Sequence, residues 1–377
     1  MDWRTEWHDF EGVAYLNAAA QAPMPRAAIR AVEDALEWKK FPHRMPDEAY
    51  FEIPHRVRTS LARLIGGAVD EIALTTGAGG GLQAVAHDLA WRPGDEVLIA
   101  RGEFPAHFAT WMPLAATGQL TVRVVEPRDR FVAAEDFLGQ IGPRTRLVSA
   151  SLVRFDDGAL LDAPRVAAAC HAVGAYLLLD VSQCAGAVPM DVTALGADFL
   201  VCAGYKWLLG PYGTGFLWAR AELIEEMRVG PFGWMALDGA AEFHKLTHCD
   251  WKPVRGARRW DAPEVASFLN LAATDASLAF LLRVGVGTVA AHCARLVAHL
   301  VERLPPDKCV LASPADAAAR GPYVCIAAHS SEDTTALYQR LRAADVIVSL
   351  REGALRVAPH LYNSEQDIER LLAVAAG

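Results

Sequence analysis

The sequence predicts an α/β protein with three α/β/α layers around a mostly parallel sheet, and a small C-terminal α/β domain beside them. Three observations support this prediction. Short apolar runs of strand length alternate with helical patterns over residues 71–217. The 377 residues are too many for one simple core. Hydrophobic residues make up 53% of the chain, which favours extensive burial over disorder. We therefore expect a large domain over residues 15–260 and a small domain formed by residues 1–14 and 261–377.

Each expected strand of the large domain is a short aliphatic run bounded by turn residues. In chain order these runs are residues 71–74, 96–100, 121–125, 145–150, 176–179 and 199–202. Apolar residues at helical spacing lie between most of them and also precede the first. The expected helices are residues 27–40, 57–65, 82–90, 133–141 and 164–173. Because strands and helices alternate, the connections fit the crossovers of a parallel sheet.

The C-terminal part of the chain has the pattern of a separate compact lobe. Two long helical patterns, residues 268–282 and 289–304, end at Pro305 and Pro306, which break a helix. Further on we expect strands at residues 323–328, 346–350 and 354–357, and helices at residues 333–344 and 365–375.

The composition indicates which kinds of partner and which cellular location to expect. The net charge is −9 and the densest basic run is short, so neither a nucleic acid nor an anionic membrane is expected as a partner. No run approaches the roughly 18 apolar residues of a membrane span, and the charged N-terminus does not resemble a signal peptide. The seven cysteines are scattered without a CxxC pair, which fits reduced thiols in a cytoplasmic protein.

Two polar residues follow two of the expected buried strands. Asp180 comes directly after residues 176–179, and Lys206 comes shortly after residues 199–202. The carboxyl ends of strands in an open α/β sheet form the edge where ligands bind. Pyridoxal phosphate (PLP) chemistry needs an acid for the pyridinium nitrogen and a lysine for the Schiff base and proton transfer. A single lysine is usually a surface residue, but Lys206 lies within an apolar run, which favours a functional role.

The segments LLLDVSQCAGAVPMDV and GYKWLLGPYGTGFLW, which contain Asp180 and Lys206, resemble the class V aminotransferase family of fold type I PLP enzymes. That family includes cysteine desulfurases, selenocysteine lyases, isopenicillin epimerase-like enzymes and kynureninase relatives. The resemblance covers nearly the whole chain and is specific to the family, but not to one reaction within it. It implies a homodimer with PLP as cofactor, and Gln183 near the phenolic oxygen of PLP.

The glycine-rich segment TTGAGGG, residues 75–81, lies between an expected strand and an expected helix. That arrangement forms an anion cradle from backbone N–H groups at a helix N-terminus. A dinucleotide fingerprint would need glycine at Leu82, so a nucleotide-binding protein is a weaker interpretation. The resemblance to the family's phosphate loop implies that Ala78, Gly79 and Gly80 donate to the PLP phosphate.

Further cofactor contacts follow from the resemblance. Phe104 occupies the position of a ring that stacks on the pyridine face, although an ordinary core phenylalanine is the alternative. His107 and Trp111 follow at helical spacing and are expected to border the substrate space. Tyr205 is expected to hydrogen-bond the phosphate. Ala203 replaces a hydroxyl residue that relatives use for the phosphate, a loss of about 1.5–3 kcal/mol if nothing compensates.

Three residues are candidates for binding the substrate. Arg356, in the segment ALRVAPHLYNSEQDI, resembles the family's arginine for the substrate α-carboxylate, a group that arginine binds in bidentate fashion. Asn17 either lines the substrate side or satisfies a turn. Arg154 stands where relatives carry Asn or Gln, and it either binds an acidic substrate group or pairs with Asp156 or Asp157.

Absent features also shape the functional hypothesis. Residues 349–354 contain no cysteine, so a desulfurase that stores a persulfide on this loop is not expected. His244 and His248 lack a third ligand, so no metal is expected. The sequence therefore predicts a PLP-dependent aminotransferase that acts on a small α-amino acid through a Lys206 Schiff base. A β-lyase or an epimerase on the same scaffold stays the alternative, and a non-catalytic binding protein is disfavoured by the intact Asp180, Gln183 and Lys206.

Overall fold

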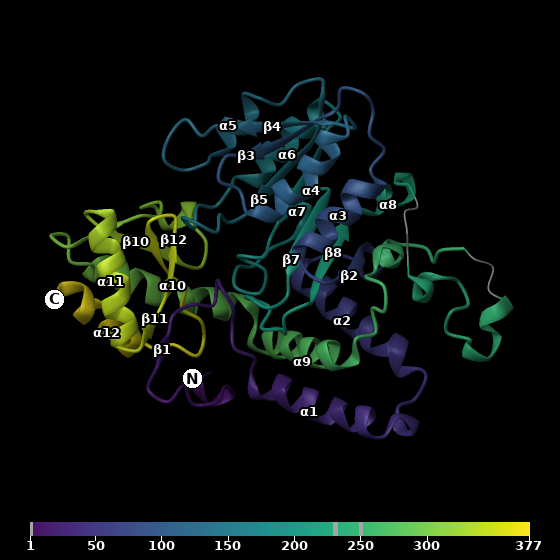
Figure 1. Ribbon diagram of the computed structural model, residues 1–377, viewed down its shortest axis with the longest axis horizontal. Coiled ribbons are helices and arrows are strands. Elements are labelled where there is room, and N and C mark those ends of the chain that lie inside the picture. The colour runs from purple at the N-terminus through teal and green to yellow at the C-terminus, as the bar shows by residue number, and fades with distance from the viewer. Residues whose placement is uncertain (1–2, 229–232, 249–251) are drawn as a thin grey trace.

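The computed structural model describes residues 3–228, 233–248 and 252–377 (Figure 1). Its main sheet has the order β2-β8-β7-β6-β5-β3-β4. The strands are β2 (Ile72–Thr75), β3 (Glu96–Ala100), β4 (Thr121–Val125), β5 (Thr145–Ser151), β6 (Tyr176–Asp180), β7 (Phe199–Ala203) and β8 (Gly215–Ala219). Neighbouring strands from β4 to β7 pair in parallel, which confirms the predicted sheet. The strand β8, which the sequence analysis did not predict, is antiparallel to both of its neighbours.

The direction of β8 decides which strand ends meet. Because β8 runs opposite to both β2 and β7, those two strands run the same way. Thr75, Asp180 and Ala203, the last residues of β2, β6 and β7, therefore end at one edge of the sheet. The loops after β3 and β5 leave from the same edge, because both strands are parallel to β6 through their neighbours.

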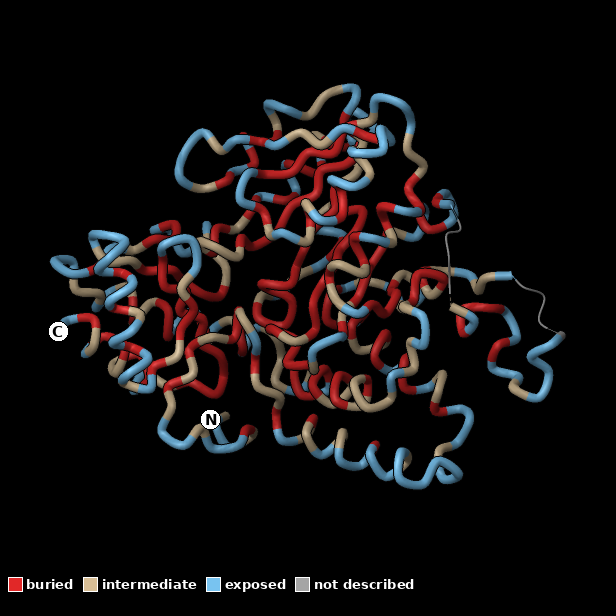
Figure 2. Tube along the Cα trace, viewed as in Figure 1, coloured by how far each residue is buried: buried red, intermediate tan, exposed pale blue. Residues whose placement is uncertain are grey.

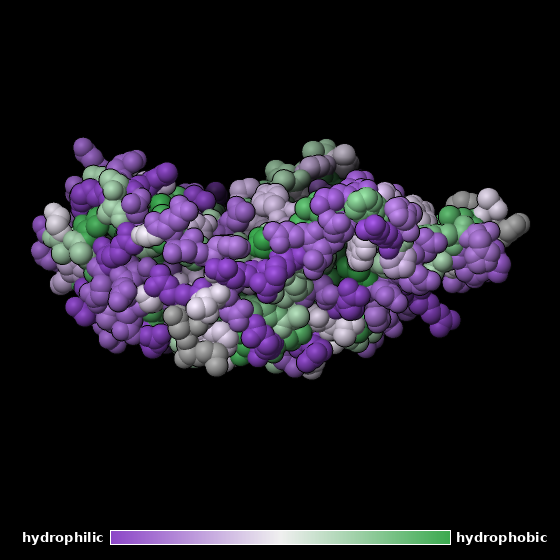
Figure 3. Space-filling model, turned by 90° about the horizontal axis from the view of Figure 1, so that it is seen from below, coloured by the Kyte–Doolittle hydropathy of each residue, from purple (hydrophilic) through white to green (hydrophobic). Residues whose placement is uncertain are grey.

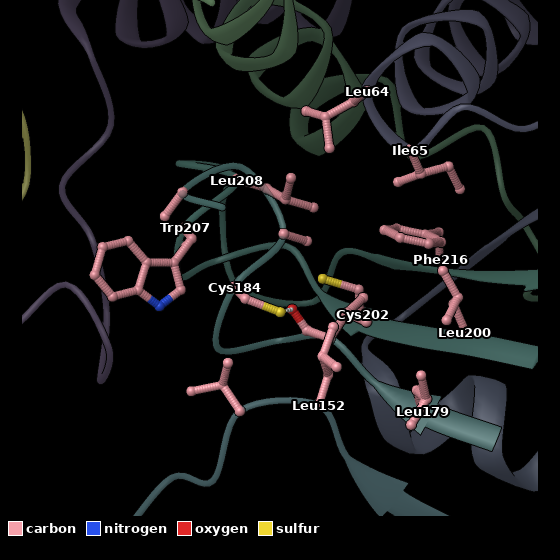
Figure 4. Packing of buried hydrophobic residues seen from close by; sticks show 14 of the residues in the cluster. Leu64, Ile65, Leu152, Leu179, Cys184, Leu200, Cys202, Trp207, Leu208 and Phe216 are labelled. Atoms are coloured by element: carbon pink, nitrogen blue, oxygen red, sulfur yellow. Dashed lines mark hydrogen bonds between the residues drawn. The ribbon is translucent and has the colours of Figure 1, made fainter. Parts of the chain in front are cut away.

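Helices cover both faces of the main sheet. The large lobe contains α1 (Arg26–Lys40), α2 (Ala49–Ile65), α3 (Ala78–Asp88), α4 (Pro105–Ala116), α5 (Ala134–Leu138), α6 (Ala163–Ala172), α7 (Val192–Leu195) and α8 (Ala221–Glu226). Side chains of β6 alternate between the layers: Leu177 and Leu179 pack on one side, and Leu178 on the other. On the first side, Leu64 and Ile65 of α2 lie over Phe216 of β8 (Figure 4).

A smaller lobe holds the C-terminal part of the chain. Its four-stranded sheet has the order β12-β13-β10-β9, and a short ladder pairs β1 with β11. The strands are β1 (Ala14–Tyr15), β9 (Cys309–Leu311), β10 (Val324–Ala328), β11 (Val346–Ile347), β12 (Ser349–Arg351) and β13 (Ala354–Val357), and the helices are α10 (Val286–Arg303), α11 (Ser331–Ala343) and α12 (Glu365–Ala376). The N-terminal segment thus pairs with the small lobe.

Helix α9 (Phe268–Val284) lies between the two lobes in sequence but packs with the large one. It contacts α1 and α2, and Leu278 and Leu281 belong to the core beneath the main sheet. The domain boundaries given above stay a prediction, and α9 links the segment after residue 261 to the large lobe. Buried residues concentrate in the main sheet, whereas α1 is exposed along much of its length (Figure 2).

The outer surface is mixed in character. Seen from below, hydrophilic residues cover most of the face, with small hydrophobic patches among them (Figure 3). Within the described residues, no single helix has the length and apolar character to cross a membrane, and only the pair α9 and α10, bent by 78°, passes that test together.

Candidate active site

Asp180 and Lys206 lie at the predicted sheet edge. Asp180 is the last residue of β6 and pairs in register with Val201 of β7, and Lys206 follows three residues after β7. Their exposed fractions are only 5% and 6%. The turn that carries Lys206 is tight: Gly210 N–H donates to the Gly204 carbonyl at 2.9 Å, and Leu209 has a φ of +60°. Such backbone conformations are uncommon for leucine and often occur at functional sites.

The environment of Lys206 favours a reactive amine. Burial lowers the pKa of Lys206; the negative charge of Asp180 opposes this, and the positive charge of Arg356 adds to it. The amine Nζ lies 5.2 Å from the ring centroid of Phe104 and 5.7 Å from that of Tyr205. The lysine is therefore accompanied by the two aromatic residues that were expected at the cofactor.

Asp180 is held as a carboxylate. Its Oδ1 accepts a 2.7 Å hydrogen bond from the Ser182 N–H. Burial acts to raise the pKa of Asp180, but the positive charges of His107 and Lys206 outweigh it and keep the pKa below its usual value. An ionised acid at this place is what a protonated pyridine nitrogen requires.

Gln183 is buried between the site and the core. Its Nε2 donates to the Ala19 carbonyl at 3.2 Å, and its Oε1 accepts from Trp207 Nε1 at 3.3 Å. Trp207 points into the hydrophobic cluster near Cys184 (Figure 4). The predicted contact of Gln183 with the cofactor stays a prediction.

The start of α3 lies where the sequence predicts an anion cradle. Gly77 caps the helix with a φ of +149°, a conformation that needs glycine. A Cβ atom on Gly77 or Gly79 would meet no atom within 4 Å, so open space lies in front of the first N–H groups of α3. Gly215 of β8 fixes this helix start to the sheet, because a Cβ there would lie 2.6 Å from Gly77 Cα. The space and the donors fit a phosphate group.

Two aromatic residues border the lysine. Phe104 caps α4, and its ring makes an edge contact with Phe155 at 5.3 Å between centroids. Tyr205 packs on Tyr212 with centroids 4.3 Å apart, and burial raises the pKa of Tyr205 to about 12. Tyr205 therefore keeps its hydroxyl proton at neutral pH and remains able to donate a hydrogen bond.

Arg356 and Asn17 approach from the small lobe. Arg356 is 2% exposed, and its Nη1 donates to the Phe155 carbonyl at 2.8 Å. Its Nε has no hydrogen-bond partner among the described residues, so the guanidinium keeps donor capacity. Ser349, which lies opposite Arg356 in the hairpin, donates to Asn17 Oδ1 at 2.7 Å. The hairpin thus brings Asn17 and Arg356 into one neighbourhood.

Arg154 lies among carboxylates of the protein. It is buried, and its Nη2 lies 2.9 Å from Asp156 Oδ2 and 2.8 Å from the Gly102 carbonyl. Glu103 lies 3.8 Å from Nη1. This arrangement corresponds to the ion-pair alternative, because carboxylates of the protein already neutralise the guanidinium. Nε and Nη1 of Arg154 have no hydrogen-bond partner among the described residues, so the predicted role of Arg154 in substrate binding stays a prediction.

Sequence reasoning missed the place of His107. It was expected to border the substrate space, but it is fully buried behind Asp180. Its Nδ1 lies 2.8 Å from Ser149 Oγ, and its Nε2 lies 3.8 Å from Asp180 Oδ2. Trp111, one turn further along α4, donates to the same Ser149 at 3.0 Å. The spacing of four residues shared by His107 and Trp111 was the available signal, because it marks the inner face of a helix.

Neither a nucleophilic cysteine nor a metal site is indicated by the described residues. Cys325 is buried and donates to the Asp156 carbonyl at 3.2 Å, and burial raises the pKa of its thiol to about 12. Such a thiol is not a nucleophile at neutral pH. Within the described ranges, no cluster of three or more His, Cys, Asp or Glu side chains is placed to hold a metal ion.

Comparisons with known proteins identify the family of the chain. The family model described as aminotransferase class-V matches residues 14–371. An uncharacterized aminotransferase, YcbU of Bacillus subtilis, is 27% identical over 95% of this chain and 92% of its own length. A probable cysteine desulfurase of Pseudomonas aeruginosa is 30% identical over 98% of this chain and 95% of its own length.

The fold comparison points the same way. A structure of a C-DES variant with glycine covalently linked to its PLP cofactor superposes with a TM-score of 0.87 at 22% identity, covering 99% of this chain and 98% of its own. The predicted three-layer fold with its small C-terminal lobe is thus confirmed. The chain belongs to the aminotransferase class-V family and is a PLP-dependent enzyme.

Proposed function

We propose that this enzyme transfers the amino group of a small α-amino acid, with Lys206 as its catalytic lysine. The observation that supports the proposal best is the position of Lys206. Its buried amine of lowered pKa follows the strand next to the one that ends in Asp180, beside the Phe104 ring. These groups are the ones that PLP chemistry on an amino acid needs at one place.

PLP, when bound, supplies an electron-withdrawing ring that makes the Cα–H bond of the substrate acidic. The residues of this chain bind and orient it. The N–H groups of Ala78 and Gly79 would bind the phosphate, together with the hydroxyl of Tyr205. The N–H group of Gly80, which the sequence analysis also assigned to the phosphate, instead donates to the Gly77 carbonyl at 3.1 Å. Asp180 holds the proton on the ring nitrogen, Phe104 packs against the ring face, and Gln183 lies near the phenolic oxygen.

Lys206 and Arg356 act on the substrate. Arg356 binds the α-carboxylate with guanidinium donors that its bond to the Phe155 carbonyl does not use. Asn17 lines the substrate side near Arg356. Lys206 takes the Cα proton and returns it, and its lowered pKa makes the neutral amine available for this step.

A β-lyase is the second candidate, and one observation favours it over a persulfide-storing desulfurase. The hairpin that carries Arg356 contains no cysteine over residues 349–354, although relatives named as probable cysteine desulfurases match the chain. A lyase that expels a side-chain group needs no nucleophilic cysteine. An epimerase would use the same residues and differ in the face to which the proton returns.

Lysine attachment tests the proposal directly. Purified enzyme incubated with PLP is expected to show a visible absorption band, and borohydride reduction is expected to fix the cofactor on the peptide that contains Lys206. Lys206→Ala is the matched control and should show neither. A cofactor fixed on another lysine would contradict the catalytic assignment.

Product analysis separates the reactions. An aminotransferase converts an amino acid to its keto acid only as an amino acceptor is consumed. A β-lyase instead releases ammonia with pyruvate or another keto acid without any acceptor, and an epimerase yields the mirror-image amino acid. An enzyme that forms none of these products from a panel of small amino acids would contradict all three.

We further propose a cytoplasmic homodimer. The segment of residues 233–248 projects at one end of the molecule (Figure 1), where Phe243 packs against Tyr50 and Phe51. A groove of about 770 Å³ beside it is lined by Tyr50, Trp234, Phe243 and Phe268, and aromatic side chains are typical of interfaces. Six described cysteines are unpaired, which suits a reducing compartment. Light scattering at micromolar concentration is expected to give twice the mass of the chain, and a monomer would contradict the homodimer.

A further inference from the structure

Behind Asp180 lies a fully buried polar group that the proposed function does not use. It consists of Trp111 and His107 from α4 and Ser149 from β5, and we call it the Asp180 relay. All three residues have an exposed fraction of 0%. Buried polar groups normally satisfy one another, yet His107 Nε2 has no hydrogen-bond partner among the described residues. That nitrogen faces Asp180 Oδ2 at 3.8 Å.

The hydrogen bonds of the relay favour a hydrogen on Nε2 of His107. Trp111 Nε1 can only donate, so Ser149 Oγ accepts from it at 3.0 Å. The Ser149 hydroxyl then has its own hydrogen to donate to His107 Nδ1, 2.8 Å away. A neutral imidazole that accepts at Nδ1 carries its hydrogen on Nε2, and an imidazolium carries one on both nitrogens. In either form, an N–H group faces Asp180.

The opposite tautomer is disfavoured by charge. It would point the lone pair of Nε2 at a carboxylate in a site buried from bulk solvent, where repulsion is strong. The charged groups around His107 are Glu103, Asp180 and Arg154. Burial acts to lower the pKa of His107, but the carboxylates of Glu103 and Asp180 outweigh it and raise the pKa above its ordinary value. Positive charge on His107 in turn keeps the pKa of Asp180 low.

We propose that His107 is a positioning residue that keeps Asp180 ionised and turned toward the ring nitrogen of bound PLP, and that Ser149 and Trp111 fix the hydrogen on the imidazole for this task. The Ser182 N–H holds the other carboxylate oxygen at 2.7 Å. One oxygen of Asp180 therefore accepts a hydrogen bond from the protein, whereas the other faces the imidazole at 3.8 Å, beyond hydrogen-bond distance, and interacts with it electrostatically. This inference rests on the proposed PLP site.

The test compares two cofactors that differ at one atom. PLP has the ring nitrogen, and its 1-deaza analogue has a carbon in that place but the same phosphate and aldehyde. His107→Leu is expected to raise the Kd of PLP for the apoenzyme by about tenfold, the effect of losing a single charge-assisted contact. The same variant is expected to leave the Kd of the deaza analogue nearly unchanged. A purely structural role would weaken both cofactors equally, and that outcome would overturn the proposal.

A spectroscopic measurement reports on the same nitrogen. With PLP labelled with ¹⁵N in the ring, the nitrogen chemical shift is expected to be that of a protonated pyridine in the native enzyme, and to move toward the unprotonated value in His107→Leu. His107→Gln, which can again present an N–H group toward Asp180, is expected to restore most of the shift and most of the affinity. An unchanged nitrogen shift in His107→Leu would also overturn the proposal.

Milder variants guard against a loss of folding. Ser149→Ala and Trp111→Phe remove one relay hydrogen bond each while keeping most of the packing, and both are expected to raise the Kd of PLP by less than His107→Leu does. No effect of either variant on PLP would contradict the relay. If the native enzyme does not bind PLP through Lys206, the proposed function fails; if it does but His107 has no selective effect, only this inference fails.

Discussion

The two sides of the active site are assembled in different ways. On the large-lobe side, Asp180 and Lys206 follow adjacent strands of one sheet, and the α3 cradle follows a third strand that runs in the same direction. On the small-lobe side, Arg356 depends on the Phe155 carbonyl, 201 positions away, and its neighbour Ser349 holds Asn17. The cofactor groups thus share one rigid frame, whereas the substrate groups depend on how two lobes meet.

This difference suggests a division of effects. Changes at the sheet edge should affect cofactor chemistry and the rate of the chemical step. Changes at the hairpin should affect substrate binding and leave the cofactor in place. The following predictions test that division, from the largest expected effect to the smallest.

The largest effect is expected from Lys206→Ala. Removal of the amine takes away both the covalent attachment and the proton carrier, so kcat should fall by at least about a thousandfold. Lys206→Arg keeps a positive charge beside Asp180 and serves as the control for electrostatics alone. Comparable activity in Lys206→Arg and the native enzyme would show that another group performs the chemistry.

Substitution of Arg356 should separate binding from chemistry. Loss of one charge-assisted bond to a carboxylate, about 1.5–3 kcal/mol, predicts that Arg356→Gln lowers kcat/KM by about 10- to 100-fold, mainly through KM. Arg351→Gln, at an exposed position on the same hairpin, is the matched control and should have a smaller effect. The visible band of bound PLP should persist in both variants. Loss of this band in Arg356→Gln would contradict the proposed separation of cofactor-binding from substrate-binding groups.

The buried lysine should leave a signature in the stability of the apoenzyme. The pKa of Lys206 is lowered from 10.5 in the folded state, so the unfolded chain binds more protons between the lowered value and 10.5. Stability relative to Lys206→Met should therefore rise with pH across that alkaline window. Chemical denaturation of both apoproteins over a pH series measures the difference. A difference that falls with rising pH would contradict a buried, destabilised ammonium.

A gain is expected from Ala203→Ser. Ala203 pairs with Gly215, which touches Gly77 at the cradle, so a new hydroxyl at this strand end would lie on the cradle side. One added bond to the phosphate, at the lower end of the range of about 1.5–3 kcal/mol, predicts a Kd for PLP lower by about tenfold. Pyridoxal, which lacks the phosphate, is the control ligand and should bind the variant and the native enzyme equally. Tighter binding of both ligands would point to a different cause.

The sequence was informative where function followed local pattern. Asp180 and Lys206 could be predicted because each follows a recognisable strand, and parallel strands end at one edge. The start of α2 was missed: residues 57–65 were expected, but the helix begins at Ala49 and contains Pro54, a residue that usually breaks helices. The strand β8 was missed because its flanking glycines and proline resemble a turn.

Long-range contacts set the limit of sequence reasoning. The choice for Arg154 between a substrate and an ion pair depends on Gly102, which lies 52 positions away. The place of His107 depends on Ser149, 42 positions away on another strand. Neither partner can be chosen from spacing alone, because helix and strand periods describe only one element at a time.

The close packing at Gly215 implies that the enzyme can be inactivated by a substitution away from the reacting groups. Gly215 touches neither Lys206 nor any group proposed to bind the substrate, yet even a methyl group there would collide with Gly77 and the Cys202 carbonyl. Gly215→Ala would push the start of α3 away from β8 and would thereby weaken phosphate binding at the cradle. Inactive alleles of this gene should therefore include changes at positions remote from every reacting atom.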